Sequence, residues 1–508
     1  MSDPAMSDVE DSIEVYLRAR FPLIWLQTHE EERVLASLLH VREAMAARKE
    51  LGFYVWSATR GLRDREGVEA APQTAGDPVM ALEHVFQSPD EAIYVFLDMH
   101  RHLTSVVERL IRDAVWKVKH TRKSLVFVGA QAEVPEDLSA DATLLYYPAP
   151  SAEELERLVD TVAAAEGQPA PDERTRDILA RALLGLTRRE AERVLRRGIA
   201  HRGTLDAGCA SEVLTEKEQT VRKDGILEFC RLGAGFAEVG GLEPLKKWFA
   251  MRRQAFDVAG QRFGLRPPRG VVLAGVPGCG KSLTAKALAA DWEVPLLHLD
   301  LGKVYGSLLG ESEDRLRRAL ATAEAVSPCI LWIDELEKAF SGLGNPRDNG
   351  VSRRLFGTFL TWLEDRTAPV FVAATANDIG RLPPEFTRKG RFDEIFFVGL
   401  PGQYERQSIF SVHLSKRRRD PSQFDLTALA KAADGYSGAE IEAAVVEGLY
   451  SAFEDGARPL AEGDILAALE ATVPLSKLRA GDIARMQEWA NVNARFAQLR
   501  KPVSVISL

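Results

Sequence analysis

The sequence predicts an α/β fold with parallel sheets flanked by helices, and three observations support this prediction. Short apolar runs alternate with helix-like stretches along most of the 508 residues. A glycine-rich loop joins one apolar run, residues 270–275, to a helix-like stretch. The two halves of the chain also repeat several landmarks in the same order. A chain of this length exceeds one compact core, so we expect several domains.

Composition and charge narrow the class of protein. The net charge is −9, and 46% of the residues are hydrophobic, which is typical of a soluble protein and argues against nucleic acid or a membrane as a general partner. The basic run Lys416–Arg419 is either a solvated helix end, which we favour, or a nucleic-acid contact. The sequence has no signal-peptide pattern, membrane-spanning run or metal-ligand spacing among its four cysteines. We therefore expect a cytoplasmic protein.

The stretch GVPGCGKS, residues 275–282, matches the phosphate-binding pattern G-x-x-x-x-G-K-[ST] and lies between a strand and a helix. In this context the backbone N–H groups of the loop would converge on the β-phosphate of a nucleotide. Lys281 would reach the β- and γ-phosphates, and Ser282 would ligate Mg²⁺. The sequence therefore predicts a nucleotide site.

Two apolar runs after the glycine loop end in polar residues that fit such a site. Residues 329–333 are followed by Asp334, which can hold Mg²⁺, and by Glu335, which can polarise an attacking water. A continuously apolar run of this kind is typical of a buried strand in a parallel sheet. The run at residues 369–376 is followed by Asn377, which either orients the attacking water or forms an ordinary turn.

Two arginines, Arg388 and Arg391, lie in the loop FTRKGRFDEIFF. In a doubly wound sheet they are poorly placed to reach the nucleotide of their own chain. They could instead reach the nucleotide of a neighbouring copy, as arginine fingers do. Taken alone they are better interpreted as surface residues, so this assignment depends on the other motifs.

In order along the chain, the motifs FAEVGG, GVPGCGKS, LGESE, WIDE, TAN, RKGRFD and GYSGAE resemble those of the AAA ATPases, from Phe236 to about Ala468. The resemblance implies a RecA-like core with Walker A and Walker B motifs, a helical lid, ATP and Mg²⁺ as cofactors, and an ATP-bridged ring, usually a hexamer. It implies that nucleotide is bound by Val239, Gly240, Pro277, Gly278, Cys279, Gly280, Lys281, Ser282, Leu283, His413, Gly438 and Ala439. It implies Mg²⁺ at Ser282 and Asp334, and catalytic roles for Glu335, Asn377, Arg388 and Arg391.

Longer stretches narrow this resemblance. GTFLTWLEDRTAPVFVAATAN, LPPEFTRKGRFDEIFFVGLP and VPLSKLRAGDIARMQEWANVNARF are similar to a poorly characterised branch of AAA proteins encoded in algal plastid genomes, cyanobacteria and other bacteria. Two departures from polypeptide-threading members are present. Leu308 and Leu309 stand where a pore aromatic pair is usual, and Glu364–Arg366 replace a usual Asp-Gly pair. The turn-rich stretch 341–350 is either a second pore loop or an ordinary surface turn.

The N-terminal half repeats landmarks of the C-terminal half. AIYVFLDMH parallels CILWIDELE, and SLVFVGAQAEVPEDL parallels PVFVAATANDIGRLPPEF. Pro150 and Gly185 lie 35 residues apart, and their counterparts Pro401 and Gly435 lie 34 residues apart. We therefore expect a second module with the same fold.

This first module lacks a phosphate loop. Its first apolar run, residues 21–27, is followed by the glutamates Glu30–Glu32, which satisfy a helix N-terminus and would repel a triphosphate. We expect Asp98 to keep the place of the metal-binding aspartate, with Met99 in place of the catalytic glutamate. We interpret the module as degenerate and expect it to bind no ATP.

The stretch DMHRH offers one rival interpretation. Alternation along an extended strand would put Asp98, His100 and His102 on one face, where they could ligate a metal. No further ligand is evident nearby in the sequence, so we favour solvated histidines at a strand end.

We predict five segments: a degenerate RecA-like AAA core (1–165), a first helical lid and linker (166–232), an active AAA core (233–402), its helical lid (403–472), and a C-terminal helix and tail (473–508). The predicted function is Mg²⁺-dependent ATP hydrolysis by a homo-oligomeric ring that remodels or regulates a client protein. The alternative is an ATP-controlled assembly switch or scaffold with slow hydrolysis. A nucleic-acid motor ranks below both because of the acidic charge balance.

Overall fold

The computed structural model describes residues 4–46, 51–89, 91–118, 121–130, 134–256, 260, 263–305, 311–339, 351–366, 368–378, 380, 384–388 and 390–499. The chain divides into two compact units, Met1–Ala210 and Ser211–Leu508. Each unit contains one seven-stranded sheet.

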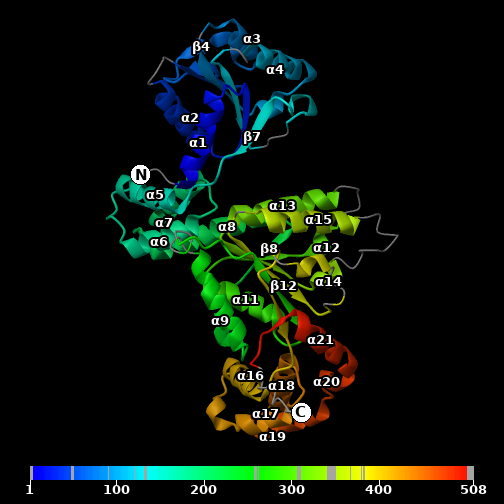
Figure 1. Cartoon of the computed structure of the whole chain (residues 1–508). Helices are drawn as coiled ribbons and strands as arrows, with labels where there is room; N and C mark the ends of the chain where they lie inside the picture. Colours follow the sequence, from blue (N-terminus) through cyan, green and yellow to red (C-terminus); the bar gives the residue numbers. More distant parts are fainter. Residues whose placement is uncertain are drawn as a thin grey trace. The chain divides into compact units, whose positions relative to one another are not determined.

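In spatial order the strands of the first unit's sheet are β4 (Glu69–Ala71), β3 (Gly61–Asp64), β2 (Gly52–Ser57), β5 (Ala92–Leu97), β6 (Ser124–Gly129), β1 (Leu23–Gln27) and β7 (Ala142–Tyr146). Five consecutive strands of this sheet, from β2 to the edge strand β7, are parallel. Only the β2–β3 and β3–β4 pairs in this unit's described sheet are antiparallel. Apolar side chains pack α1 (Pro4–Arg18) and α2 (Glu31–Ala46) on one face, and α3 (Pro78–Gln87) and α4 (Ser105–Val118) on the other (Figure 1).

A small helical subdomain follows this sheet, formed by α5 (Ala152–Ala165), α6 (Glu173–Leu183) and α7 (Arg188–Arg202). The starts of α5 and α7 are encoded locally. Ser151 and Thr187 each accept a hydrogen bond from the backbone N–H three residues later, and Glu154 and Glu190 at those positions bond back to the cap residues. Such capping boxes satisfy the otherwise unpaired N–H groups of a helix start.

The second sheet repeats the central arrangement of the first. In spatial order its strands are β14 (Arg495–Phe496), β13 (Glu394–Val398), β9 (Gly270–Gly275), β12 (Val370–Ala376), β11 (Cys329–Ile333), β10 (Leu296–Leu299) and β8 (Leu227–Cys230). The order β10-β11-β12-β9-β13 corresponds to β2-β5-β6-β1-β7 of the first unit, and all these neighbours pair in parallel. The predicted tandem of two α/β modules is therefore confirmed.

Helices cover both faces of the second sheet, and a helical lid follows it (Figure 1). Its apolar core packs α9 (Glu243–Arg253) and α11 (Lys281–Trp292) on one face, and α13 (Glu311–Val326) and α15 (Val351–Asp365) on the other. The lid consists of α16 (Gln403–Lys416), α17 (Leu426–Ala432), α18 (Gly438–Glu454) and α19 (Glu462–Ala471). The helices α20 (Leu475–Leu478) and α21 (Ala480–Asn493) lead back to β14 at the sheet edge.

Two edge strands come from stretches that the sequence led us to place outside the core. β8 lies in the predicted linker and pairs antiparallel with β10, whereas β14 lies in the predicted tail and pairs with β13. The predicted domain limits stay predictions. Leu308, Leu309 and the stretch 341–350 lie outside the described residues. Within the ranges given above, no helix is both long and apolar enough to cross a membrane.

Candidate functional site

The glycine loop connects β9 to α11 through two residues in the left-handed region. Gly278 has φ 75° and Gly280 has φ 89°, which residues with a side chain rarely adopt. At Gly278 a Cβ would also lie 3.1 Å from Ser437 Oγ of the lid. The loop thereby leads directly into the start of α11, where the first N–H groups of the helix can bind an anion.

A cavity of about 390 Å³ opens at this loop between the sheet and the lid. Its lining includes all the residues predicted to bind nucleotide, namely Val239, Gly240, Pro277, Gly278, Cys279, Gly280, Lys281, Ser282, Leu283, His413, Gly438 and Ala439. Asp334, Glu335 and Asn377 line the same cavity. Ala439 N donates a hydrogen bond of 2.9 Å to Gly278 O, which joins the start of α18 to the loop.

Further residues line the cavity that we did not assign from the sequence. They are Glu238, Leu242, Thr375, Gly399, Pro401, Glu405, Ile409, Val412, Glu442 and Gln498. Glu238 and Thr375 stand inside the motifs FAEVGG and TAN, so those motifs were a signal for them. Gln498 lies near the C-terminus, and no local pattern pointed to it.

Lys281 is the cation of the loop. Its Nζ donates hydrogen bonds of 2.9 Å to the carbonyl oxygens of Gly275 and Val276. Burial lowers the pKa of Lys281 to about 8. Burial also raises the pKa of the neighbouring Cys279 thiol to about 12, so this thiol is neutral. An anionic ligand at the loop would place negative charge beside this buried ammonium group.

The ends of β11 and β12 bring the acidic residues and the amide together. Ser282 Oγ donates to Asp334 Oδ1 at 2.9 Å, and the Thr375 hydroxyl donates to the same oxygen. Glu335 N donates to Thr375 Oγ1 at 3.0 Å, and Asn377 Nδ2 donates to Glu335 Oε1 at 3.0 Å. These residues meet because β11 and β12 are parallel neighbours, so their carboxyl ends reach the same edge of the sheet.

The donor set beside the loop suits a magnesium ion. The Ser282 hydroxyl and the Asp334 carboxylate offer hard oxygen atoms 2.9 Å apart. Mg²⁺ is usually held in this way, by one or two protein oxygens together with phosphate oxygens and water. The carboxylate of Glu335 is engaged elsewhere, since Lys338 Nζ lies 2.5 Å from its Oε2.

Arg388 and Arg391 lie at the opposite end of the sheet from the glycine loop. β13 is parallel to β9 and pairs Val398 with Gly275, the last residue before the loop. The two arginines precede β13, so they lie near the amino end of β9. Neither arginine is among the described residues that line the cavity.

The two arginines differ in exposure and contacts. Arg388 is exposed. The side chain of Arg391 is only 15% exposed, and its Nε donates to Glu364 Oε1 at 2.5 Å. Arg391 Nη1 also donates to Glu385 O at 2.7 Å. Arg391 is therefore held within its own chain, whereas Arg388 is open to a neighbour.

A polar cluster closes the lid side of the cavity. His413 Nδ1 lies 3.4 Å from Glu442 Oε1, and Arg417 Nη2 donates to the same oxygen at 2.9 Å. Burial lowers the pKa of His413, so its ring is neutral at pH 7. Because Nδ1 faces Glu442, Nε2 is the ring nitrogen that a ligand in the cavity could contact.

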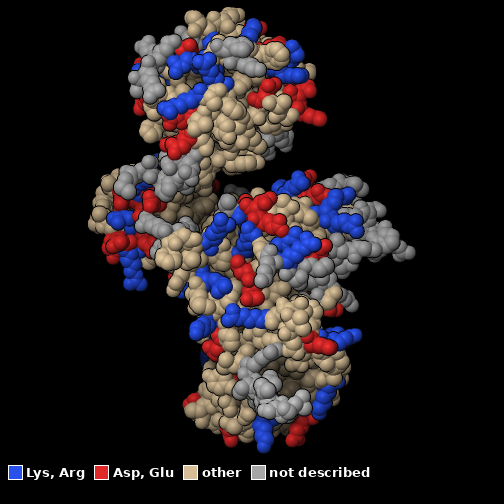
Figure 2. Space-filling view, viewed as in Figure 1, with Lys and Arg blue, Asp and Glu red and all other residues tan. Residues whose placement is uncertain are grey.

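The basic run Lys416–Arg419 ends α16, and half of its charges are paired. Lys416 Nζ lies 2.7 Å from Glu238 Oε2, and Arg417 pairs with Glu442. Figure 2 shows Lys and Arg interspersed with Asp and Glu over the face that it presents. These observations favour the helix-end interpretation over a nucleic-acid contact.

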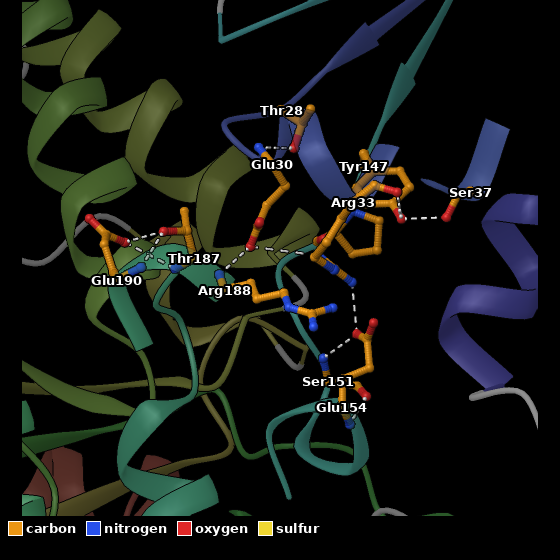
Figure 3. A network of polar contacts seen from close by, with 11 residues as sticks. Thr28, Glu30, Arg33, Ser37, Tyr147, Ser151, Glu154, Thr187, Arg188 and Glu190 are labelled. Atoms are coloured by element: carbon orange, nitrogen blue, oxygen red, sulfur yellow. Dashed lines mark hydrogen bonds and ion pairs between the residues drawn. The ribbon is translucent and has the colours of Figure 1, made fainter. Parts of the chain in front are cut away.

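In the first unit, a network of charged side chains lies where the second unit has its cavity (Figure 3). Glu30, in the loop after β1, accepts a hydrogen bond of 2.7 Å from Arg188 N at the start of α7. Arg33 Nη1 lies 3.7 Å from Glu30 Oε1, and Arg33 Nη2 lies 2.7 Å from Glu154 Oε2. The side chains of Arg33 and Glu30 are only 6% and 7% exposed. The network therefore joins the sheet to the helical subdomain in a buried position.

This network takes the place of the contact between glycine loop and lid. In the second unit, Ala439 N donates to Gly278 O, whereas in the first unit Arg188 N donates to the Glu30 carboxylate. We expected Glu30–Glu32 to satisfy the start of their own helix. Glu31 and Glu32 do lie in the first turn of α2, whereas the Glu30 carboxylate accepts a hydrogen bond from the start of α7. Burial raises the pKa of Glu30, as expected for a carboxylate in so enclosed a place.

We expected Asp98 to correspond to Asp334, and this prediction was wrong. Asp98 has φ 55° and Glu335 has φ 51°, and each follows a central buried strand of its sheet. Asp98 thus corresponds to Glu335, and the apolar Leu97 stands in the place of Asp334. The first unit therefore lacks a counterpart of Asp334, whereas an acid remains at the position of Glu335.

The stretch DMHRH is not an extended strand. Met99–His102 form a 3₁₀ helix, so alternation does not put the three candidate ligands on one face. The alternative that we favoured, solvated histidines at a strand end, is also wrong for His100, because its side chain is only 9% exposed. His102 packs edge-on against Trp56, with ring centroids 5.5 Å apart. Across the described ranges, no three or more His, Cys, Asp or Glu residues are grouped to hold a metal.

Comparison with known proteins identifies the class. The model described as "ATPase family associated with various cellular activities (AAA)" matches residues 271–400, and the AAA+ lid domain matches 423–467. Models of the N-terminal and second domains of SpoVK-like AAA ATPases match residues 9–147 and 153–224. The chain therefore belongs to the AAA ATPase family.

Within this family the chain is similar to proteins named ycf46. The AAA domain-containing protein ycf46 of Guillardia theta is 37% identical over 490 residues, which cover 96% of this chain and 95% of that protein. The ycf46 protein of Trieres chinensis is 37% identical over 489 residues, covering 95% and 96% of the two chains. The proteasome-activating nucleotidase of Aeropyrum pernix is 33% identical over 265 residues, covering 49% of this chain and 62% of that protein.

Proposed function

We propose that the cavity of the second unit binds ATP with Mg²⁺ and hydrolyses ATP to ADP and phosphate. The convergence of Lys281, Ser282, Asp334, Glu335 and Asn377 on one cavity carries this proposal. Lys281 would neutralise the β- and γ-phosphates. Ser282 and Asp334 would hold Mg²⁺, which supplies further positive charge to the phosphates when bound.

Glu335 is the group that we propose to activate water. Its left-handed backbone turns it away from the line of β11, and its carboxylate accepts a hydrogen bond from Asn377 Nδ2 at 3.0 Å. A carboxylate beside the γ-phosphate would take the proton of the attacking water. Asn377 would orient both that carboxylate and the attacking water.

We further propose a homo-oligomeric ring, a hexamer as in many family members, in which Arg388, and Arg391 once it is released from Glu364, act on the ATP of a neighbouring copy. Their position at the far end of the sheet from the glycine loop supports action between copies. We propose that this ring remodels or regulates a client protein in the cytoplasm. A relative named proteasome-activating nucleotidase is consistent with a protein partner, although the likeness covers 49% of this chain.

ATP affinity is expected to fall as the pH rises above about 8. The free protein holds Lys281 with a pKa of about 8, and a bound triphosphate favours the charged form, so its pKa rises in the complex. Below pH 8 the lysine is already charged, whereas above it binding must take up a proton. The Kd should then increase by up to about tenfold per pH unit. Isothermal titration with a non-hydrolysable ATP analogue at pH 7 to 9.5, in two buffers of different ionisation enthalpy, measures both the Kd and the proton uptake. A flat profile would contradict the assignment.

Mixing two inactive variants tests action between copies. Lys281→Ala should not bind ATP, and Arg388→Ala should bind ATP but hydrolyse it about a thousandfold more slowly, the lower range for arginine fingers. In a mixed ring, the intact loop of one variant meets the intact arginine of the other. Phosphate release by an equimolar mixture should therefore exceed that of either variant alone. The exposed Arg419→Ala is the control and should keep full activity. If the variants assemble together without recovering activity, Arg388 does not act in trans.

A further inference from the structure

The C-terminal segment, residues 475–499, returns from the lid to the sheet edge. After α20 and α21 it forms β14, which pairs in parallel with β13, and Ala497 N donates to Phe397 O at 3.0 Å. The rings of Phe397 and Phe496 meet edge to face at 5.4 Å. This segment lies beyond the ranges matched by the AAA and AAA+ lid models, which end at residues 400 and 467.

The helix α21 packs against the back of the glycine loop. Its buried residues Ile483 and Ala490 share a small apolar core with Val276, which is the first loop residue after β9 and is fully buried. Met486 of α21 and Cys279 of the loop pack against the same core. The outer wall of the loop is therefore made by the C-terminal helix, and the phosphate-binding face is left to the cavity.

The C-terminal segment reaches the cavity at Gln498. Its Nε2 donates to Gly399 O at 2.7 Å, and its Oε1 accepts from Gly399 N at 3.1 Å. Gln498 and Gly399 both line the cavity. Because one amide satisfies both backbone groups of Gly399, it fixes the turn that leads from β13 to the lid.

A second contact ties the same segment to the lid. Leu475 N donates to Glu440 Oε1 at 2.7 Å. Glu440 is the capping-box residue of α18, and its Oε2 accepts hydrogen bonds from Ser437 N at 2.7 Å and Ser437 Oγ at 2.8 Å. The segment thus holds the lid at its start and the sheet at its end, and it passes behind the glycine loop between these two points.

We propose that residues 475–499 form an integral part of the ATP site and that Gln498 is a positioning residue for the nucleotide. This inference rests on the proposed ATP-binding function. Gln498 acts through Gly399 by fixing the wall of the cavity at the junction of sheet and lid, whereas Glu335 and Asn377, proposed to act at the γ-phosphate, follow β11 and β12. Its loss should therefore weaken binding of ADP and ATP alike, with little change in turnover once the site is filled.

The test compares Gln498→Ala with Gln423→Ala, an exposed glutamine that lies before α17 and outside both the C-terminal segment and the cavity lining. We expect Gln498→Ala to raise the Kd for ADP and the KM for ATP by about tenfold, as the loss of two hydrogen bonds allows, while kcat stays within about twofold of wild type. Gln423→Ala should match wild type. Gln498→Glu keeps the size and one acceptor but cannot donate to Gly399 O, so it should behave like Gln498→Ala.

Thermal unfolding without nucleotide checks that the variants are folded. If wild type binds ADP and Gln498→Ala binds it equally well, the inference is wrong and the proposed ATPase function stands. If Gln498→Ala binds ADP weakly but Gln498→Glu binds it as tightly as wild type, loss of the hydrogen bond to Gly399 O does not cause the weaker binding. The inference is then also wrong. If wild type itself binds neither ADP nor ATP, the proposed function fails together with the inference.

Discussion

Replacing Glu335 by glutamine is expected to slow ATP hydrolysis by at least about a hundredfold, because general-base catalysis contributes roughly that factor or more. Glutamine has the same shape and can still accept the hydrogen bond from Asn377 Nδ2, but it cannot take a proton from water. Ser282, Asp334 and Lys281 are unchanged, so binding of ATP and Mg²⁺ should stay close to wild type. Phosphate release at saturating ATP, together with the Kd for ATP, measures both parts of this result.

The control for this variant is Glu447→Gln, an exposed glutamate of α18. It makes the same chemical change away from the cavity and should keep wild-type turnover. If Glu335→Gln hydrolyses ATP at the wild-type rate, another group activates the water and the role proposed for Glu335 is wrong. If the variant loses ATP binding as well, its defect is not one of catalysis.

The same variant separates the remodelling and switch hypotheses. A ring that binds ATP without hydrolysing it should keep hold of a client. We would purify tagged Glu335→Gln from a lysate of the native cells with ATP and, in parallel, without nucleotide. A protein retained only with ATP would support remodelling and identify the client. An ATP-dependent ring that retains no protein would support the switch or scaffold.

Replacing Arg33 by methionine is expected to destabilise the first unit by about 3–5 kcal/mol, the usual cost of removing one partner from a buried ion pair. The side chain of Arg33 is only 6% exposed and lies close to both Glu30 and Glu154. Methionine fills much of the same volume, but it leaves two partly or fully buried carboxylates without their cation. Arg33 Nη1 also donates to Pro148 O at 2.9 Å, and that bond is lost as well.

Differential scanning calorimetry of the full chain measures this effect. The transition of the first unit should fall by roughly 10 °C, while the transition that ADP raises, assigned to the second unit, should stay in place. Arg65→Met is the control, because Arg65 and its partner Glu66 are 52% and 67% exposed and such pairs contribute little. An unchanged first transition in Arg33→Met would show that the buried network does not stabilise the unit.

Much of the second module could be predicted because its signals are local. The glycine pattern predicts residues with a left-handed backbone conformation, and Gly278 and Gly280 do have positive φ values. The residues that follow each apolar strand were assigned to one site because parallel strands end at a common edge. Asp334, Glu335 and Asn377 accordingly line one cavity with Lys281.

The first module was harder to predict because its landmarks are less specific. Its shared fold was visible in matching spacings, and the shared strand order confirms it. The counterpart of Asp98 was misassigned, because an acid after an apolar strand can occupy either of two neighbouring positions. The backbone conformation decides between them, since Asp98 and Glu335 are both left-handed.

By itself, the sequence determined the class of this protein, the presence of two similar modules and most of one nucleotide site, because these depend on patterns spanning a single loop, strand or helix start. Only the tertiary structure decided which distant groups complete each site. Glu30 caps a helix that begins more than 150 residues later, and Gln498 bonds Gly399 across a separation of 99 residues. Such contacts follow from how whole sheets and helices pack, and no local pattern of residues encodes that packing.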